Sequence, residues 1–332
     1  MNKVQNICFL DSKDNKDIYE KAKPLLDRIE PKFLESFELL EFLGQGSESE
    51  VYKAYIKSSK KVVAMKMILI KKGRRKNKNE INISKKLKHK NIINFYVAGE
   101  FKKNELYCIV TDYAKYGNLR QFQKLSKIKS NLSESLICFL AYQILEGLKY
   151  CHLCKIIHFD LKPQNILIDN NLNVKIIDFS ISLEYNKIIS DKIKIPIRGS
   201  KFYIAPEIIK NDTIKIEDFN KIDIFSFGVI LYNLAFDSYP FFSEDINSFE
   251  QIDLKELNTI NKYYSLYFID FIKKLLEKDI NKRINIEQAL NDYWIKGVDI
   301  LFKEKEKLNN DDIFLSHLIY DNFWAFNHYI KK

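Results

Sequence analysis

The chain has 332 residues, of which 46% are hydrophobic and 30% charged, and its formal net charge is +10. These numbers allow a sizeable core in one large domain or two lobes. The longest apolar stretch, Phe225–Phe236, contains Ser226, Gly228 and Asn233, so a membrane-spanning segment is excluded. The positive charge could serve acidic partners, nucleic acid or anionic membrane, but lysines scattered over a solvated surface are the favoured explanation.

The five cysteines are an odd number without a regular framework, which predicts reduced thiols and a cytoplasmic protein. Cys151 and Cys154 flank His152 in a cluster that invites a zinc interpretation, but a second ligand pair at metal-site spacing is missing. Zinc is therefore not expected. The stretch Met1–Leu10 lacks a basic region followed by a long apolar core, so a signal peptide is not expected either.

The chain begins with a polar segment of 36 residues, interpreted as an extension with a short helix at Ile18–Ile29. The pattern then changes to β-strands, predicted at Phe37–Leu43, Glu50–Ile56 and Val62–Ile70. The first turn holds Gly44 and Gly46, and small residues there let backbone N–H groups approach a polyphosphate. An ordinary hairpin would also explain two glycines.

The middle of the chain alternates basic, helical and strand patterns. Six basic residues lie within Lys71–Lys78, which fits a nuclear-localisation patch or, as we favour, a solvated loop. A helix is predicted at Glu80–Lys88, a buried strand at Leu106–Tyr113 and a long helix at Ser133–His152, with Ser133 as the N-cap. The long helix carries an apolar stripe formed by Leu136, Leu140, Ile144 and Leu148.

The stretch from His158 to Asp178 concentrates polar residues beside apolar anchors. Asp160 and Asn165 lie on a loop that Pro163 keeps from becoming helical. Two short buried strands, Ile166–Ile168 and Val174–Ile177, follow, and the turn between them should bring Asp178 back beside Asn165. Two oxygen ligands at that place suit a hard cation such as magnesium that holds phosphates.

Taken together in chain order, these motifs resemble those of the eukaryotic protein kinase superfamily, serine/threonine type. The matching segments are Gly44-Gln45-Gly46, Val63-Ala64-Met65-Lys66, His158-Phe159-Asp160, Asp178-Phe179-Ser180, Ala205-Pro206-Glu207, Asp223–Gly228 and Asp279–Arg283. The resemblance implies an α+β, bilobal fold with a small β-rich N-lobe, helix C and a larger, mainly α-helical C-lobe. The expected divisions are an extension (1–36), a kinase domain (37–295, with lobes 37–114 and 115–295) and an aromatic-rich tail (296–332) that packs as a helix on the body.

The resemblance also implies a phosphotransfer site that uses ATP with Mg²⁺, or alternatively Mn²⁺. Its expected catalytic residues are Asp160, Lys162, Lys66 and Asn165, and its metal ligands are Asn165 and Asp178. The expected ATP-binding residues are Leu43, Gly44, Gly46, Val51, Ala64, Lys66, Glu80, Thr111, Asp112, Ala114, Leu167 and Asp178. Within this set, Glu80 should pair with Lys66, Asp160 should take the substrate's proton, and Thr111 should be the gatekeeper.

Four positions depart from the family pattern. Ser49 replaces the third glycine of the glycine-rich turn, and Ser180 replaces the glycine after Asp178-Phe179. Phe159 replaces an arginine that commonly pairs with a phosphorylated residue, and Pro196 occupies the usual phosphoacceptor position. We therefore expect activity without a phosphate on the segment from Asp178 to Glu207, which corresponds to the activation segment of the family. Ser190 and Ser200 are the phosphate acceptors left to test. The alternative is a pseudokinase that acts as a nucleotide-responsive binding or scaffold protein.

Further expectations concern packing and partners. Ser84 stands where the family has a large aliphatic residue on helix C, and we hypothesise that Phe95 on the next strand compensates for it. Gln164 and Asn118 are neutral where kinases with basic-directed specificity commonly carry acidic residues, so acidic protein substrates are favoured. A cytoplasmic monomer without membrane or specific nucleic-acid binding is expected, with nuclear entry through Lys71–Lys78 as the alternative.

Overall fold

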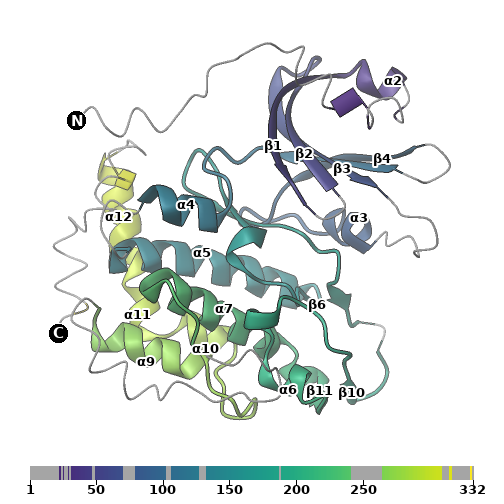
Figure 1. Ribbon diagram of the computed structural model, residues 1–332. Coiled ribbons are helices and arrows are strands. Elements are labelled where there is room, and N and C mark those ends of the chain that lie inside the picture. The colour runs from purple at the N-terminus through teal and green to yellow at the C-terminus, as the bar shows by residue number, and fades with distance from the viewer. Residues whose placement is uncertain are drawn as a thin grey trace. The chain divides into compact units, whose positions relative to one another are not determined.

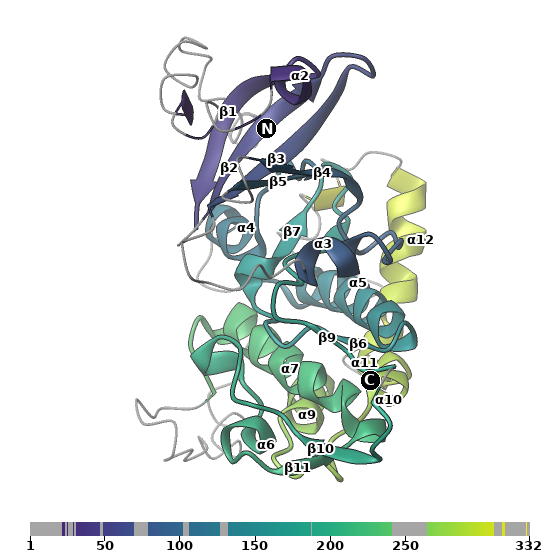
Figure 2. The same ribbon diagram turned by 90° about the vertical axis from the view of Figure 1, so that its right-hand side faces the viewer.

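The computed structural model describes residues 22, 23, 25, 29, 31–46, 49–69, 79–101, 106–126, 132–186, 188–240, 264–308, 314–315 and 330. The chain divides into two compact units, one formed by Met1–Lys88 with Ile93–Lys115 and the other by His89–Ile92 with Tyr116–Lys332 (Figures 1 and 2). The first unit is built on a β-sheet and the second is mainly helical, which confirms the predicted α+β fold. The basic run Lys71–Lys78 lies outside the described residues.

The first unit contains a five-stranded antiparallel sheet with the strand order β1-β2-β3-β5-β4. Its strands are β1 (Phe37–Gln45), β2 (Ser49–Ile56), β3 (Lys61–Leu69), β4 (Phe95–Phe101) and β5 (Leu106–Asp112). On β3, Met65 and Met67 are fully buried, while Ala64 and Lys66, which alternate with them, are partly exposed. This alternation follows from the two-residue period of a strand, and it gives the sheet one apolar face and one polar face.

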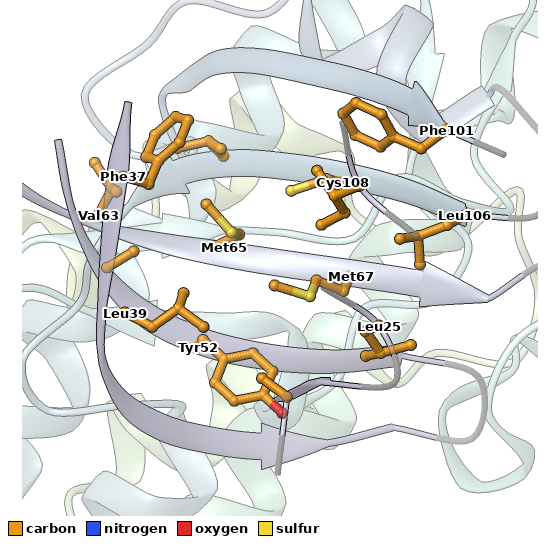
Figure 3. Close-up of a cluster of buried hydrophobic side chains, with 14 residues drawn as sticks. Leu25, Phe37, Leu39, Tyr52, Val63, Met65, Met67, Phe101, Leu106 and Cys108 are labelled. Atoms are coloured by element: carbon orange, nitrogen blue, oxygen red, sulfur yellow. The ribbon is translucent and has the colours of Figure 1, made fainter. Parts of the chain in front are cut away.

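The apolar face of the sheet carries the core of the first unit (Figure 3). Leu39, Tyr52, Met65, Met67, Leu106 and Cys108 are among its members. Ala22, Leu25 and Ile29 from the N-terminal segment also belong to this core. Ala22, Lys23 and Leu25 are helical, as predicted for Ile18–Ile29, and most of that range lies outside the described residues. These three apolar residues therefore pack on the sheet as part of the first unit.

Short helices accompany the sheet. α2 (Pro31–Leu34) precedes β1, and its Phe33 ring lies 5.1 Å from the rings of both Phe37 and Phe101. α3 (Asn79–Ser84) ends four residues before the predicted end at Lys88. The reason is local: the N–H groups of Lys86 and Leu87 both donate to the Ile83 carbonyl, which tightens the last turn and stops the α-helical ladder.

The second unit is organised around α5 (Glu134–Leu153), whose residues are mostly buried. The Ser133 hydroxyl accepts a hydrogen bond from the Leu136 N–H at 3.2 Å, which confirms the predicted N-cap. α7 (Asn220–Phe236), buried along most of its length, lies beside α5 in both views (Figures 1 and 2). The other helices are α4 (Leu119–Ser126), α6 (Pro206–Ile209), α9 (Leu266–Leu275), α10 (Ile286–Leu290), α11 (Tyr293–Lys296) and α12 (Val298–Leu308).

Three small strand pairs position the loops of the second unit. They are β6 (Ile156–Ile157) with β9 (Leu183–Glu184), β7 (Ile166–Ile168) with β8 (Val174–Ile176), and β10 (Lys192–Lys194) with β11 (Thr213–Lys215). The β7–β8 turn is closed by Asp169, whose Oδ1 accepts the N–H groups of Asn171 and Asn173 at 2.9 and 2.8 Å. This hairpin was predicted from the sequence and is confirmed.

The C-terminal region packs on α5 as far as it is described. The Phe314 ring is fully buried and lies 5.1 Å from Phe139 of α5, while Phe302 of α12 lies 5.2 Å from the same ring. The remaining aromatic residues of the predicted tail helix (Tyr320, Phe323, Trp324, Phe326 and Tyr329) lie outside the described residues. Across the described helices, none combines the length and the apolar character needed to cross a membrane.

Candidate active site

The polar face of the sheet in the first unit gathers the predicted nucleotide-binding side chains. Val51 of β2 pairs with Lys66 of β3, and Ala64 of β3 pairs with Thr111 of β5. Because Ala64 and Lys66 are two residues apart on one strand, all four side chains belong to the same face of the sheet. Leu43 lies on β1 and is partly buried. A single face of the sheet therefore carries four of the predicted residues, Val51, Ala64, Lys66 and Thr111.

The glycine-rich turn joins β1 and β2, and its residues 47 and 48 lie outside the described residues. The Gly46 N–H donates to the Ser49 carbonyl at 2.7 Å. A Cβ atom at Gly46 would lie 2.9 Å from the Ser49 hydroxyl oxygen, whereas a Cβ atom at Gly44 would meet nothing within 4 Å. A side chain at Gly46 would therefore require the Ser49 hydroxyl to rotate away, and the space beside Gly44 is open.

The Lys66 side chain is held by Glu80. Its Nζ atom donates to Glu80 Oε1 at 2.8 Å and to Oε2 at 3.0 Å, which confirms the predicted pair. Glu80 lies in the first turn of α3, where a carboxylate interacts favourably with the exposed N–H groups of the helix. The pair fixes one ammonium group on the polar face of the sheet, at a position suited to phosphate oxygens.

The end of β5 carries the residues expected to contact adenine. The Asp112 N–H donates to the Asn94 carbonyl at 3.1 Å, so the Asp112 carbonyl is the backbone group that suits an adenine amino group. The Asp112 carboxylate accepts a hydrogen bond from the Tyr96 hydroxyl and lies 3.1 Å from Lys61 Nζ. These contacts fix the strand end that leads to Ala114, which is buried.

Ser84 and Phe95 are the two residues for which compensating sizes are hypothesised. Ser84 is buried, and the ammonium of Lys85, the next residue, lies 6.0 Å from the centre of the Phe95 ring. Phe95 is partly buried and pairs with Thr111 across β4 and β5. The Lys85 side chain thus connects the C-terminal end of α3 with the Phe95 ring, and the compensation of Ser84 by Phe95 stays a hypothesis.

In the second unit, Asp160 is the centre of a compact polar cluster. Its Oδ2 accepts hydrogen bonds from Lys162 Nζ at 2.7 Å and from Asn165 Nδ2 at 3.1 Å. Its Oδ1 accepts from the Ser200 hydroxyl at 2.7 Å, and Lys162 Nζ also donates to that hydroxyl oxygen at 2.7 Å. The predicted bonds of Ser200 to Asp160 and Lys162 are thereby confirmed. Three residues, Lys162, Asn165 and Ser200, thus hold the Asp160 carboxylate in a fixed orientation.

The two predicted metal ligands come close through the backbone. The Ile177 N–H donates to the Asn165 carbonyl at 3.0 Å, which places Asp178, the next residue, beside Asn165 as predicted. Asn165 Nδ2 donates to the Asp160 carbonyl at 2.8 Å, so its Oδ1 is the atom suited to a cation. An amide oxygen and a carboxylate form an oxygen-only donor set that fits Mg²⁺ or Mn²⁺, with phosphate and water supplying the other positions.

The loop from His158 to Asn165, called the catalytic loop below, is held by Asp223 of α7. Asp223 is fully buried, and its carboxylate accepts the N–H groups of His158 and Phe159 at 2.9 and 3.0 Å. It also accepts a hydrogen bond from His152 Nε2 at 2.9 Å. Burial alone would raise the pKa of the Asp223 carboxyl, but these hydrogen bonds hold that pKa below its ordinary value.

The roles of Asp223 and His152 were missed by the sequence analysis. Asp223 looks like a helix start, and α7 indeed begins near it, but its carboxylate serves the loop instead of the helix end. His152 lies in the Cys-His-Leu-Cys cluster for which zinc is not expected; Cys151 is fully buried, and burial raises the pKa of its thiol. Within the part of the chain that the structure describes, no group of three or more His, Cys, Asp and Glu side chains is placed to hold a metal ion. The signal that could have identified His152 is its place in the last turn of α5, just before the loop.

His158 connects the catalytic loop to the second metal-ligand segment. Its Nδ1 accepts the Asp160 N–H at 3.2 Å, so its Nε2 carries the proton and donates to the Ile177 carbonyl at 2.8 Å. The rings of His158 and Phe179 lie 5.0 Å apart, and Phe179 is fully buried. His158 therefore joins the two segments that supply Asp160 and Asp178, through one hydrogen bond and one ring contact.

The segment from Asp178 to Glu207 is fixed at its far end by a buried ion pair. Arg283 donates to Glu207 Oε1 at 2.7 Å and to Oε2 at 2.9 Å in a bidentate arrangement. Both residues are at most 4% exposed. The predicted pair is confirmed, and it holds the segment against the core of the second unit.

Two departures from the family pattern have a clear local structure. Phe159 is buried and has φ +65°, and Asp178 has φ +66°. Ser180 is not among the residues with positive φ, so its side chain causes no backbone strain in this conformation.

Comparison with known proteins agrees with this site. The family model for the protein kinase domain matches residues 37–295. The chain is 34% identical over 258 residues to serine/threonine-protein kinase TIO of Arabidopsis thaliana, covering 76% of this chain and 18% of that protein. It is 31% identical over 283 residues to CBL-interacting protein kinase 11 of Oryza sativa subsp. japonica, covering 83% and 55% of the two chains. It is 32% identical over 269 residues to serine/threonine-protein kinase 36 of Pongo abelii, covering 80% and 20%.

The fold and the polar clusters define a protein kinase domain of the serine/threonine type. This chain belongs to the protein kinase domain family. It spans between 18% and 55% of the length of these three relatives.

Proposed function

We propose that the chain transfers the γ-phosphate of Mg-ATP to serine or threonine hydroxyls of protein substrates. The observation that carries this proposal is the cluster in which Lys162, Asn165 and Ser200 all contact the Asp160 carboxylate. Such a carboxylate can accept a hydrogen bond from a substrate hydroxyl and take its proton as the oxygen attacks phosphorus. Lys162, which already reaches Ser200, can neutralise charge on the γ-phosphate.

The other polar residues have supporting roles in this proposal. Lys66, held by Glu80, would bind the α- and β-phosphates, and Gly44 and Gly46 would let backbone N–H groups approach them. Asn165 and Asp178 would hold the divalent cation, which neutralises phosphate charge when bound. The Asp112 carbonyl and the Ala114 backbone would receive adenine, while Leu43, Val51, Ala64 and Thr111 of the same unit would contact it.

The proposal includes activity without a phosphate on the activation segment. Phe159 offers no cation to receive a phosphate, and Pro196, which is exposed, offers no hydroxyl to carry one. Of the two acceptors left, Ser200 is engaged by Asp160 and Lys162, so a phosphate there would break the polar cluster. Ser190 is exposed and its hydroxyl contacts only the nearby backbone at Lys192.

Acidic protein substrates are the class we propose. The activation segment presents exposed lysines at positions 192, 194 and 201. Exposed charges of one sign favour ligands of the opposite sign and speed their association. A peptide library with acidic, neutral and basic flanking residues would show the preference, and faster phosphorylation of basic peptides would contradict it.

The test is transfer of labelled phosphate from ATP with magnesium to generic protein substrates. Wild type and Asp178→Ala are compared, with Asp191→Ala as the matched control because Asp191 is an exposed carboxylate on the same segment. We expect transfer by wild type and the control, and loss in Asp178→Ala. Equal labelling by all three would favour the pseudokinase alternative, with a contaminating kinase as the source. Phosphatase treatment should leave wild-type activity intact, and its abolition would disprove phosphate-independent activity.

A further inference from the structure

Arg198 of the activation segment lies against Phe159 of the catalytic loop. Its guanidinium carbon is 5.1 Å from the centre of the Phe159 ring. A cation within about 6 Å of an aromatic ring centre is attracted by the negative face of the ring. The contact therefore joins the activation segment to the residue that directly precedes Asp160.

The surroundings of this contact make it strong. Phe159 is 5% exposed, and its N–H is bound to Asp223 at 3.0 Å, so the ring is a fixed platform. Arg198 is half-buried, and burial lowers the pKa of its guanidinium, which nevertheless stays protonated. Arg198 also donates to the Ile181 carbonyl at 3.4 Å. Among the described residues it forms no ion pair with a carboxylate, so the ring is its main electrostatic partner.

The residues after Arg198 continue along the same loop. Gly199 has φ +101°, and a Cβ atom there would lie 2.4 Å from the Phe159 carbonyl oxygen. Only glycine lets the two backbones approach this closely. Next, the Ser200 hydroxyl donates to Asp160 Oδ1 at 2.7 Å. Arg198 thus contacts the Phe159 ring, Gly199 lies against the Phe159 carbonyl, and Ser200 binds the Asp160 carboxylate.

The preceding part of the segment is anchored separately. β10 pairs with β11, and the Ile216 N–H donates to the Asp191 carbonyl at 2.9 Å. Both views show β10 and β11 side by side, next to α6 (Figures 1 and 2). Ile195 is buried just after β10, whereas Pro196 and Ile197 are exposed, so Arg198 is the next side chain that attaches the segment on its way to the catalytic loop.

We propose that Arg198 is a positioning residue for phosphotransfer, and that its contact with Phe159 replaces the pairing of a catalytic-loop arginine with a segment phosphate. The roles are exchanged: the segment supplies the cation, and the catalytic loop supplies the partner. The contact fixes residues 198–200, so that Ser200 orients the Asp160 carboxylate. This inference rests on the proposed kinase activity.

The first test separates the electrostatic contact from simple packing. Arg198→Met and Phe159→Leu keep similar bulk but remove the charge or the aromatic face, whereas Phe159→Trp keeps the face. We expect the two losses to lower kcat about tenfold, with an unchanged KM for ATP, and Phe159→Trp to lower kcat less than Phe159→Leu does. Lys210→Met, which removes an exposed positive charge just beyond α6, is the control. Wild-type kcat in Phe159→Leu would overturn the proposal.

The second test exchanges the partners. Phe159→Arg places two guanidinium groups together, and Arg198→Phe removes the cation, so each single variant should lose activity. The double variant restores one cation and one ring, and we expect it to recover to within about threefold of wild type. Purely additive losses in the double variant would overturn the proposal, since packing alone predicts no rescue. Thermal unfolding of each variant verifies that it is folded.

A third measurement does not depend on catalysis. Hydrogen exchange of amides in residues 191–200 should be faster in Arg198→Met than in wild type, and unchanged in Phe159→Trp. If wild type transfers no phosphate but this difference appears, the kinase proposal fails while the docking contact stands. Equal exchange in all three proteins would refute the contact itself, whatever the activity.

Discussion

The catalytic loop and the activation segment of the second unit are fixed in different ways. The catalytic loop rests on Asp223, which is fully buried and accepts two backbone N–H groups and a His152 hydrogen bond. Among the described residues, the activation segment has one buried ion pair, Glu207 with Arg283, at its end. Its middle is attached by a three-residue strand pair, by the buried side chain of Ile195 and by Arg198. The loop proposed to perform chemistry is thus held by hydrogen bonds to a buried charge, whereas the middle of the segment proposed to receive substrate is held by one apolar side chain and by more accessible contacts.

This difference has a physical reason. Hydrogen bonds to a buried carboxylate are strong because water does not compete for them, and losing one leaves a polar group unpaired. Contacts at a partly exposed surface are weaker and can reform after displacement. A loop that orients a reacting carboxylate benefits from the first arrangement. A segment that must admit different protein substrates benefits from the second.

The largest expected effect comes from Asp160→Asn, which tests the rigid side of the comparison. An amide cannot take the substrate proton, so kcat should fall roughly 10²- to 10⁴-fold. With the amide oxygen in the place of Oδ2, Lys162 and Asn165 can still donate to it, and the amide N–H can donate to the Ser200 hydroxyl oxygen, so the melting temperature should change little. Labelled-phosphate transfer and thermal unfolding measure the two quantities. Asp212→Asn, at an exposed position, is the control, and a wild-type kcat in Asp160→Asn would contradict the assignment.

The buried anchor of the activation segment should dominate its stability. Glu207→Gln leaves the Arg283 guanidinium buried without its counter-charge, and we expect a loss of roughly 3–5 kcal/mol in the free energy of unfolding. The exposed pair of Lys274 and Asp270, at 2.6 Å, is the comparison, and Asp270→Asn should cost less than about 1 kcal/mol. Denaturant unfolding measures both. Similar losses would show that the two pairs are equally solvated.

Replacing Asp223 should loosen the catalytic loop. Asp223→Asn keeps the shape but weakens the charged hydrogen bonds to His158 and Phe159, which should cost about 1.5–3 kcal/mol. The folded-state pKa of Asp223 lies below its ordinary value of 3.8, so this contribution is fully present above pH 3.8 and disappears as the pH falls through the folded-state pKa. Unfolding titrations of both proteins should converge in acid. A constant difference down to that pH range would contradict the assigned cause.

The smallest expected effect concerns Ser180 beside Asp178. Glycine there would add conformational freedom worth about 0.4–1 kcal/mol, because it lowers the cost of the backbone rotations that flip Asp178. Ser180→Gly should therefore bind inhibitors that need the flipped state about two- to fivefold more tightly, with little change in kcat. Inhibitor affinities measured by calorimetry would test this. Unchanged affinity would mean that Ser180 does not restrict the flip.

Much of the fold could be predicted because local patterns and tertiary packing agree. The alternation at Met65 and Met67 identifies a strand with one buried face, and the structure has β3 there. Ser133 before a long apolar stripe identifies the start of α5. The motif residues of the site were also identifiable, because Asp160, Asn165 and Asp178 sit at fixed places relative to short apolar strands.

The contacts that link distant segments could not be predicted in this way. Arg198 meets Phe159 across 39 residues, and a cation over a ring follows no sequence period. The strands β10 and β11 have three residues each, too few for an alternation to be distinguished from chance. The same limit applied to Ala22 and Leu25, because a polar segment gives no sign that a few of its apolar residues complete a core elsewhere.

The packing of Ala22, Leu25 and Ile29 on the sheet has a practical consequence for the boundaries of this protein. The match to the kinase family begins at residue 37, after all three of these residues. A shortened chain starting at Phe37 would expose part of the apolar face shown in Figure 3 to water. The smallest piece expected to fold unaided therefore begins upstream of the region that identifies the family, and homology alone would place the cut inside the core.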